Sequence, residues 1–223
     1  MKRISTSGWF LTLTYLTWFG LFSVSQPSGF CGETKTTPNA TQSKVEKLNS
    51  ETLQKIFDFA KGVKERKWRY IVLHHSATST GTAKAFDRFH RETFKDPDGL
   101  EYHFVILNGS GKGSLDGLIE VGPRWKKQML GNHLFRPELA QESIAICFVG
   151  NFEEKDRVTK NQFHFAVELI KRLMTRYGID EKDIITHKDI DGDPKNDSRP
   201  TSKCPGKYFP YMEIINELKR QKI

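Results

Sequence analysis

Ser143-Ile-Ala-Ile-Cys-Phe-Val149 is the stretch that decides the fold. An apolar run of this length, with β-branched and aromatic residues, predicts a buried strand at the centre of a sheet. Around it we predict strands over 68–74, 102–107, 118–121 and 184–186, and helices over 83–94, 162–177 and 211–220. Strands that alternate with helices indicate an α/β domain with a central mixed β-sheet flanked by helices.

For two of the helices, the sequence also predicts which residues face the core or where the helix ends. In the helix over 83–94, Phe86 and Phe89 are expected to face inward. The helix over 162–177 has an apolar stripe at helical spacing and is expected to end at Gly178, because glycine is the usual residue just past a helix end.

The composition limits the class of partner. The chain has 35 Lys and Arg against 27 Asp and Glu, a net charge of +8. Such a chain suits polyanions, including anionic cell-wall polymers and lipid head groups. No basic run is interleaved with base-stacking aromatic residues, so nucleic acid is not expected as a partner. We expect a monomer.

The N-terminal segment 1–31 predicts a signal peptide or a membrane anchor. Lys2 and Arg3 precede an apolar stretch, and Ser23-Val-Ser25 offers small residues for cleavage. Cys31 leaves a third reading open, an acylated lipoprotein. Each reading places the protein outside the cytoplasm, whether secreted, periplasmic or attached to the membrane. We then expect a linker over 32–49, a leading helix over 50–67 and the domain proper over 68–223.

Three side chains form a candidate metal site: His74, His187 and Cys204. Two imidazoles and a thiolate suit zinc, and three protein ligands leave a coordination position open for water. The competing reading is three unrelated residues. Cys204 stands in a polar loop, where a ligand role explains it, whereas Cys147 lies in the apolar run and is expected to be a small core residue.

Strand geometry restricts which neighbours can share the site. Successive side chains of a strand point to opposite faces, so His74 and His75 cannot both enter one cleft, and Tyr102 and His103 diverge in the same way. The residues alone leave open which member of each pair faces the site.

Several segments together resemble one family, the zinc-dependent type 2 N-acetylmuramoyl-L-alanine amidases. This family includes amidase-type phage lysozymes and peptidoglycan recognition proteins. The matching segments occur in the family's order, over roughly 68–218: His74-His-Ser-Ala-Thr78, Phe89-His-Arg91, Tyr102-His-Phe104, Gly131-Asn-His133, Ser143 to Gly150, His187-Lys-Asp189 and Cys204-Pro-Gly206. The resemblance implies a zinc site at the strand ends of a mixed sheet.

The resemblance also implies a function and residue roles. It implies a zinc-dependent hydrolase that cleaves the amide bond between N-acetylmuramic acid and L-alanine, with peptidoglycan or muropeptides as partners. The alternative is a non-catalytic peptidoglycan-binding module on the same fold; recognition-only members typically lack the cysteine ligand. The implied roles are zinc binding by His74, His187 and Cys204, hydrogen bonding beside the metal by Tyr102, substrate binding by His133, and structural or surface positions for His75, His103, His90 and His164.

Three positions depart from the family's pattern. Cys147 stands where some members place a glutamate base. Ser202 stands where Lys or Thr is common, so Lys203 becomes a catalytic candidate only if the loop shifts its register. The polar segment 191–200 lengthens the gap between His187 and Cys204, and we expect it to border the substrate groove.

Overall fold

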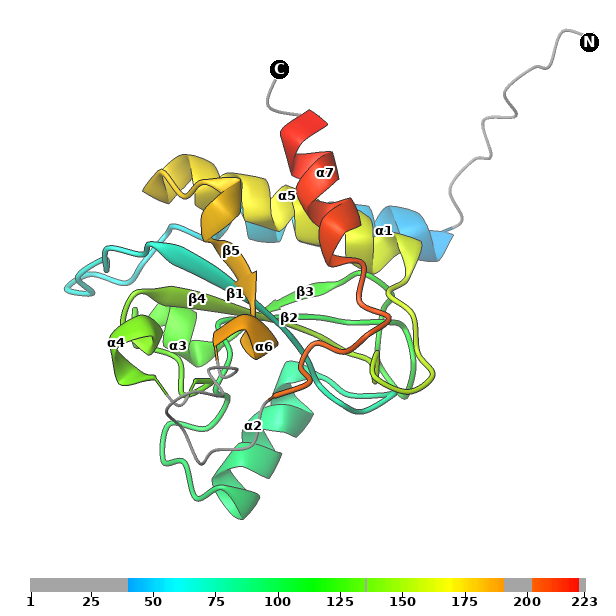
Figure 1. Ribbon diagram of the computed structural model, residues 1–223, viewed down its shortest axis with the longest axis horizontal. Coiled ribbons are helices and arrows are strands. Elements are labelled where there is room, and N and C mark those ends of the chain that lie inside the picture. The colour runs from blue at the N-terminus through cyan, green and yellow to red at the C-terminus, as the bar shows by residue number, and fades with distance from the viewer. Residues whose placement is uncertain (1–39, 135, 191–201, 221–223) are drawn as a thin grey trace, which may run out of the picture. The chain divides into compact units, whose positions relative to one another are not determined.

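The computed structural model describes residues 40–134, 136–190 and 202–220. Figure 1 shows a sheet with helices on both of its faces. The strands are β1 (Tyr70–His75), β2 (Phe104–Ile106), β3 (Ile119–Val121), β4 (Ser143–Phe148) and β5 (Ile184–Thr186). The longer helices are α1 (Ala40–Lys55), α2 (Ala83–Thr93), α5 (Lys160–Tyr177) and α7 (Tyr211–Arg220). The short helices are α3 (Pro123–Lys126), α4 (Pro137–Ala140), α6 (His187–Ile190) and the 3-10 turn η1 (Glu181–Asp183).

The sheet is mixed, and its strand order is β3-β2-β4-β1-β5. β4 pairs in parallel with β1 and β2, β5 pairs in parallel with β1, and only β3 runs antiparallel, beside β2. All six residues of β4 are buried, as expected for a strand covered on both faces. The predicted α/β class with a central mixed sheet is therefore confirmed.

Alternating side chains separate the core into two layers. Ile71, Leu73, Ile146 and Phe148 belong to the larger cluster with residues of α1, α5 and α7. Cys147 belongs to the smaller cluster, which includes Phe86 of α2. In Figure 1, α1, α5 and α7 accordingly lie on one side of the sheet and α2 on the other. His74 points to the α2 side, because it alternates with Leu73.

The helix α5 ends at Gly178 as predicted, and a capping box that was not predicted marks its start. Thr159 and Gln162 form a capping box at its start, and Gly178 ends it in the left-handed conformation with φ 66°. The Gln162 amide also donates to the backbone carbonyls of Ile106 and Val149, both at 3.0 Å. These bonds fix the helix against the ends of β2 and β4.

The first helix lies earlier in the chain than predicted. The sequence suggested a linker to residue 49 and a helix over 50–67, whereas α1 spans Ala40–Lys55. It is anchored by buried Val45, Asn49 and Leu53. Asn49 accepts from the Ile119 N–H and donates to the Gly117 carbonyl. A pattern of apolar residues misses this helix, because its central anchor is polar.

The other predicted elements are present, with some strands shorter than expected. Phe86 faces inward, but the expectation for Phe89 was wrong, since its side chain is 49% exposed. Within the described ranges, no helix is long and apolar enough to cross a membrane. The predicted signal peptide or anchor over 1–31 and the insertion over 191–200 lie outside the described residues.

Candidate metal centre and pocket

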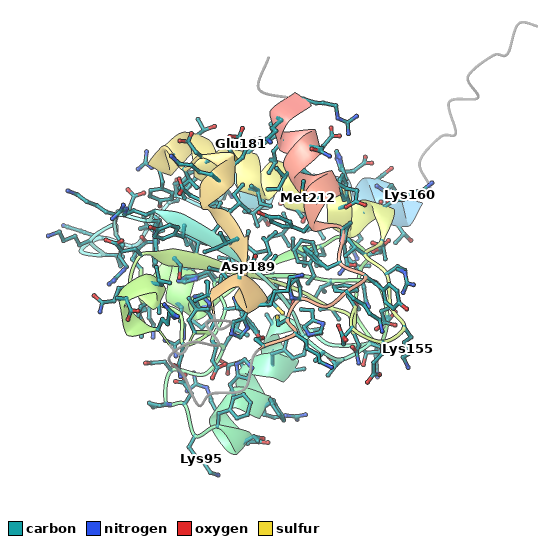
Figure 2. The ribbon with its side chains drawn as sticks, in the orientation of Figure 1. Lys95, Lys155, Lys160, Glu181, Asp189 and Met212 are labelled. Carbon is teal, nitrogen blue, oxygen red and sulfur yellow. The ribbon has the colours of Figure 1, made fainter. Side chains whose placement is uncertain are left out.

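Two parallel strands end side by side and bring two histidines together. β5 pairs with β1 so that Thr186 lies opposite Leu73, which places His187 beside His74. The two imidazole centroids are 4.8 Å apart. Asp189, labelled in Figure 2 on α6, accepts the backbone N–H and the hydroxyl of Thr186 at 3.0 and 2.5 Å. This cap fixes the turn from which His187 projects.

The third candidate ligand comes from the loop after residue 201. The Lys188 N–H donates to the Cys204 carbonyl at 2.8 Å, which ties this loop to α6. Gly206 has φ 103°, and a Cβ there would lie 2.3 Å from the Glu153 nitrogen, so only glycine allows the loop to pack this closely. The His75 N–H donates to Cys204 Sγ at 3.3 Å, which fixes the position of the sulfur at the end of β1.

The donor atoms of His74, His187 and Cys204 all lie within 4.8 Å of one another. His74 Nδ1 is 3.7 Å from Cys204 Sγ. Tetrahedral zinc, with bonds of about 2.0–2.1 Å to nitrogen and about 2.3 Å to sulfur, requires a separation of roughly 3.6 Å between such atoms. Burial, and then the neighbouring His133 and His187, hold the pKa of His74 well below its usual value. The imidazole therefore stays neutral, the form that binds metal.

His133 lies behind His74 and is 6% exposed. His133 Nδ1 is 2.9 Å from His74 Nε2, and its Nε2 is 3.3 Å from the Ser143 hydroxyl. If His74 Nδ1 binds a metal, its proton must be on Nε2, which then donates to His133; the His133 proton in turn faces Ser143. Sequence reasoning placed His133 in the substrate groove and missed this contact.

Tyr102 faces His74 across 5.3 Å between ring centroids. It precedes β2 and packs with Cys147 on the α2 side of the sheet. Burial is the largest cause that raises its pKa well above the usual value, followed by the nearby thiols of Cys147 and Cys204. Tyr102 therefore stays a neutral phenol that can donate a hydrogen bond. Cys147 is fully buried, in agreement with its predicted core position.

A pocket of about 350 Å³ opens over these residues. It is lined by His74, Phe94, Glu101, Tyr102, Asn132, His133, Leu134 and His187. Glu101 was not predicted from the sequence, and its side chain is 13% exposed. Another cavity, of about 580 Å³, lies beside α1 and β3, but no histidine or cysteine lines it. The chemistry therefore points to the smaller pocket.

Arg124 connects the segments that form the far side of this pocket. Its guanidinium pairs with buried Asp96 at 2.6 Å and donates to the carbonyls of Leu100 and Leu130. Asn132 adds a bond to the same Asp96 carboxylate at 3.0 Å. One buried cation thus fixes the loops that carry Glu101 and His133.

The remaining predicted residues do not line this pocket. The Lys203 side chain is 78% exposed and its Nζ is 3.9 Å from Glu153, while the Ser202 hydroxyl accepts the Cys204 N–H at 3.2 Å. The structure therefore does not bring Lys203 to the other site residues. Four histidines have the expected packing or surface positions: His75 lies near Phe152, His103 bonds Ala145 and Met129, His90 is buried against Phe94, and His164 is exposed.

Comparisons with known proteins give one family match. The family model described as N-acetylmuramoyl-L-alanine amidase matches residues 64–207, which include all of the predicted site residues. No curated protein matches the chain.

Solved structures share the fold. The endolysin amidase LysCS of Clostridium intestinale URNW is 28% identical, with 69% of this chain and 84% of that chain covered and a TM-score of 0.54. Two further structures are similar in fold alone. Bumblebee PGRP-SA is 19% identical, with 72% of this chain and 92% of that chain covered and a TM-score of 0.50. Peptidoglycan recognition protein-LE in complex with tracheal cytotoxin is 21% identical, with 67% of this chain and 80% of that chain covered and a TM-score of 0.51. Because the family match spans more than half of the residues, this chain belongs to the N-acetylmuramoyl-L-alanine amidase family.

Proposed function

We propose that the protein is a zinc-dependent N-acetylmuramoyl-L-alanine amidase, which hydrolyses the amide between N-acetylmuramic acid and L-alanine in peptidoglycan. The observation that carries this proposal is the group of His74, His187 and Cys204 beside a pocket, in a chain of this family. A complete set of three donors favours catalysis over recognition alone, because three ligands leave room for a reacting group.

Each residue has a distinct role in the proposed reaction. His74, His187 and Cys204 would hold zinc, which when bound lowers the pKa of water to about 7 and polarises a carbonyl. The Tyr102 hydroxyl, kept protonated by burial, donates a hydrogen bond to the developing oxyanion. His133 orients His74 through the 2.9 Å contact. Substrate contact by His133 and a catalytic charge from Lys203 remain predictions from the sequence.

The proposal extends to partner and location. The substrate is peptidoglycan or a soluble muropeptide, and the net charge of +8 suits anionic cell-wall polymers. Action on peptidoglycan is consistent with a location outside the cytoplasm, either secreted or attached to the membrane through the N-terminal segment.

Identification of the reaction products tests the proposal. Digestion of purified peptidoglycan should release free stem peptides with a new L-alanine amino terminus, without new reducing sugar ends, as measured by mass spectrometry. Chelation should abolish the products and added zinc should restore them. Elemental analysis should find about one zinc per chain, which is lost in Cys204→Ser and His187→Ala but kept in the exposed His164→Ala control.

Other outcomes would contradict the proposal in recognisable ways. Cleavage within the stem peptide would indicate an endopeptidase. Tight binding of peptidoglycan without products from zinc-loaded protein would identify a recognition module. Zinc content unchanged in both ligand variants would rule out this metal site.

A further inference from the structure

We propose that Glu101 is the catalytic acid that protonates the leaving amine when the amide is cleaved. This inference rests on the proposed amidase function and adds a residue to that site. Glu101 lies in the pocket with His74 and His187. It is the only carboxylic acid among the described residues that line this pocket. The position where some members of the family place a glutamate is occupied here by Cys147.

The surroundings of Glu101 leave its carboxyl group available. It is 13% exposed, and its Oε2 lies 4.0 Å from His90 Nδ1. That nitrogen already accepts the Glu101 backbone N–H at 3.0 Å, so it has no proton to give to the carboxylate. The neighbouring Arg124 is engaged by Asp96 at 2.6 Å. Neither His90 nor Arg124 therefore donates a hydrogen bond to the carboxyl group.

Burial and the negative charge of Asp96 raise the pKa of Glu101 to about 7, although Arg124 acts in the opposite direction. The titratable or charged groups around it are His90 on α2, Asp96 after α2, Arg124 on α3, the adjacent Tyr102, and the pocket histidines His74, His133 and His187. An acid with a pKa near the working pH is suited to proton transfer in both directions. Tyr102 is not suited to this proton transfer, because the pKa of its phenol is raised well above its usual value.

The proposed step conserves protons. The oxygen of water forms a bond to the acyl carbon, and the bond from this carbon to nitrogen breaks with its electron pair on nitrogen. Glu101 gives its proton to that nitrogen, which leaves as the amine of L-alanine. The proton released by the attacking water returns to Glu101, so the carboxyl group ends the cycle as it began.

The Glu101→Gln variant tests the role, because glutamine has the same shape but cannot transfer the proton. We expect kcat on a muropeptide to fall by about 10²–10⁴, with zinc content and folding unchanged. In the parent protein, kcat/KM should fall as pH rises through about 7, since the protonated form is active. Glu101→Gln should lack this alkaline decline. An analogue with a 4-nitroaniline leaving group, which needs little protonation, should lose far less activity on the substitution.

Glu142→Gln provides the matched control, because Glu142 is an exposed carboxylate paired with Arg69 just before β4. It should retain the parent's rate and pH profile. A Glu101→Gln variant that keeps the parent's rate, or that is impaired equally on both substrates, would overturn the inference and leave the amidase function intact. Absence of products from the parent protein would instead refute the proposed function itself.

Discussion

The two sides of the pocket are built in different ways. On the metal side, His74 and His187 extend from adjacent parallel strands, and the main chain of Lys188 holds the Cys204 loop against them. On the opposite side, Glu101 and Asn132 belong to loops that are joined through the buried Arg124. The metal side is therefore held by strand pairing, whereas the opposite side is held by the guanidinium group of Arg124. We infer that metal binding and proton transfer can be altered separately.

Tyr102→Phe is expected to have a larger effect than His133→Ala or Lys203→Ala. Loss of a single donor to an oxyanion typically lowers the rate by about 10²–10³. Zinc content should not change, because Tyr102 is not one of the three proposed ligands. Turnover on muropeptides and elemental analysis measure the two quantities. Near-normal turnover would show that another group performs this role; Tyr70→Phe, at the start of β1, is the control.

His133→Ala should have an intermediate effect, on metal binding rather than on proton transfer. Removing the partner of a metal-bound histidine typically weakens metal affinity by about 10–100-fold. Competition with a fluorescent chelator measures the zinc Kd, and excess zinc should recover most of the activity. If zinc affinity is unchanged while KM rises, the original prediction of a substrate-binding His133 is the better one. His164→Ala serves as the control.

Lys203→Ala should have the smallest effect. The side chain is 78% exposed, and its Nζ lies 3.9 Å from the Glu153 carboxylate. Exposed pairs of this kind contribute about 0–1 kcal/mol, so steady-state turnover should stay within about twofold of the parent value. A tenfold loss would indicate that the loop shifts its register in the active protein and brings Lys203 into the pocket.

The difference between local sequence signals and contacts of distant residues explains what the sequence could predict. The apolar run around Cys147, and the apolar stripe of α5 with Gly178 at its end, are local signals, so the sheet and that helix were found. The side-chain types suggested the candidate metal ligands, and the resemblance of the surrounding segments to the family assigned them. Glu101 was missed because its environment depends on Arg124 and Asp96, which only the folded chain brings near it. Likewise, the contact between His74 and His133 joins residues 59 positions apart.

The Cys204 loop has a consequence for the integrity of the whole domain. His74 and Cys204 are 130 positions apart in the chain, so a metal bound by both would act as a reversible cross-link between the first strand and the C-terminal region. A ligand that binds only the folded state adds about 4 kcal/mol of stability when its free concentration is a thousandfold above Kd. Zinc supply would then determine how long the folded protein resists proteolysis as well as how fast it hydrolyses its substrate.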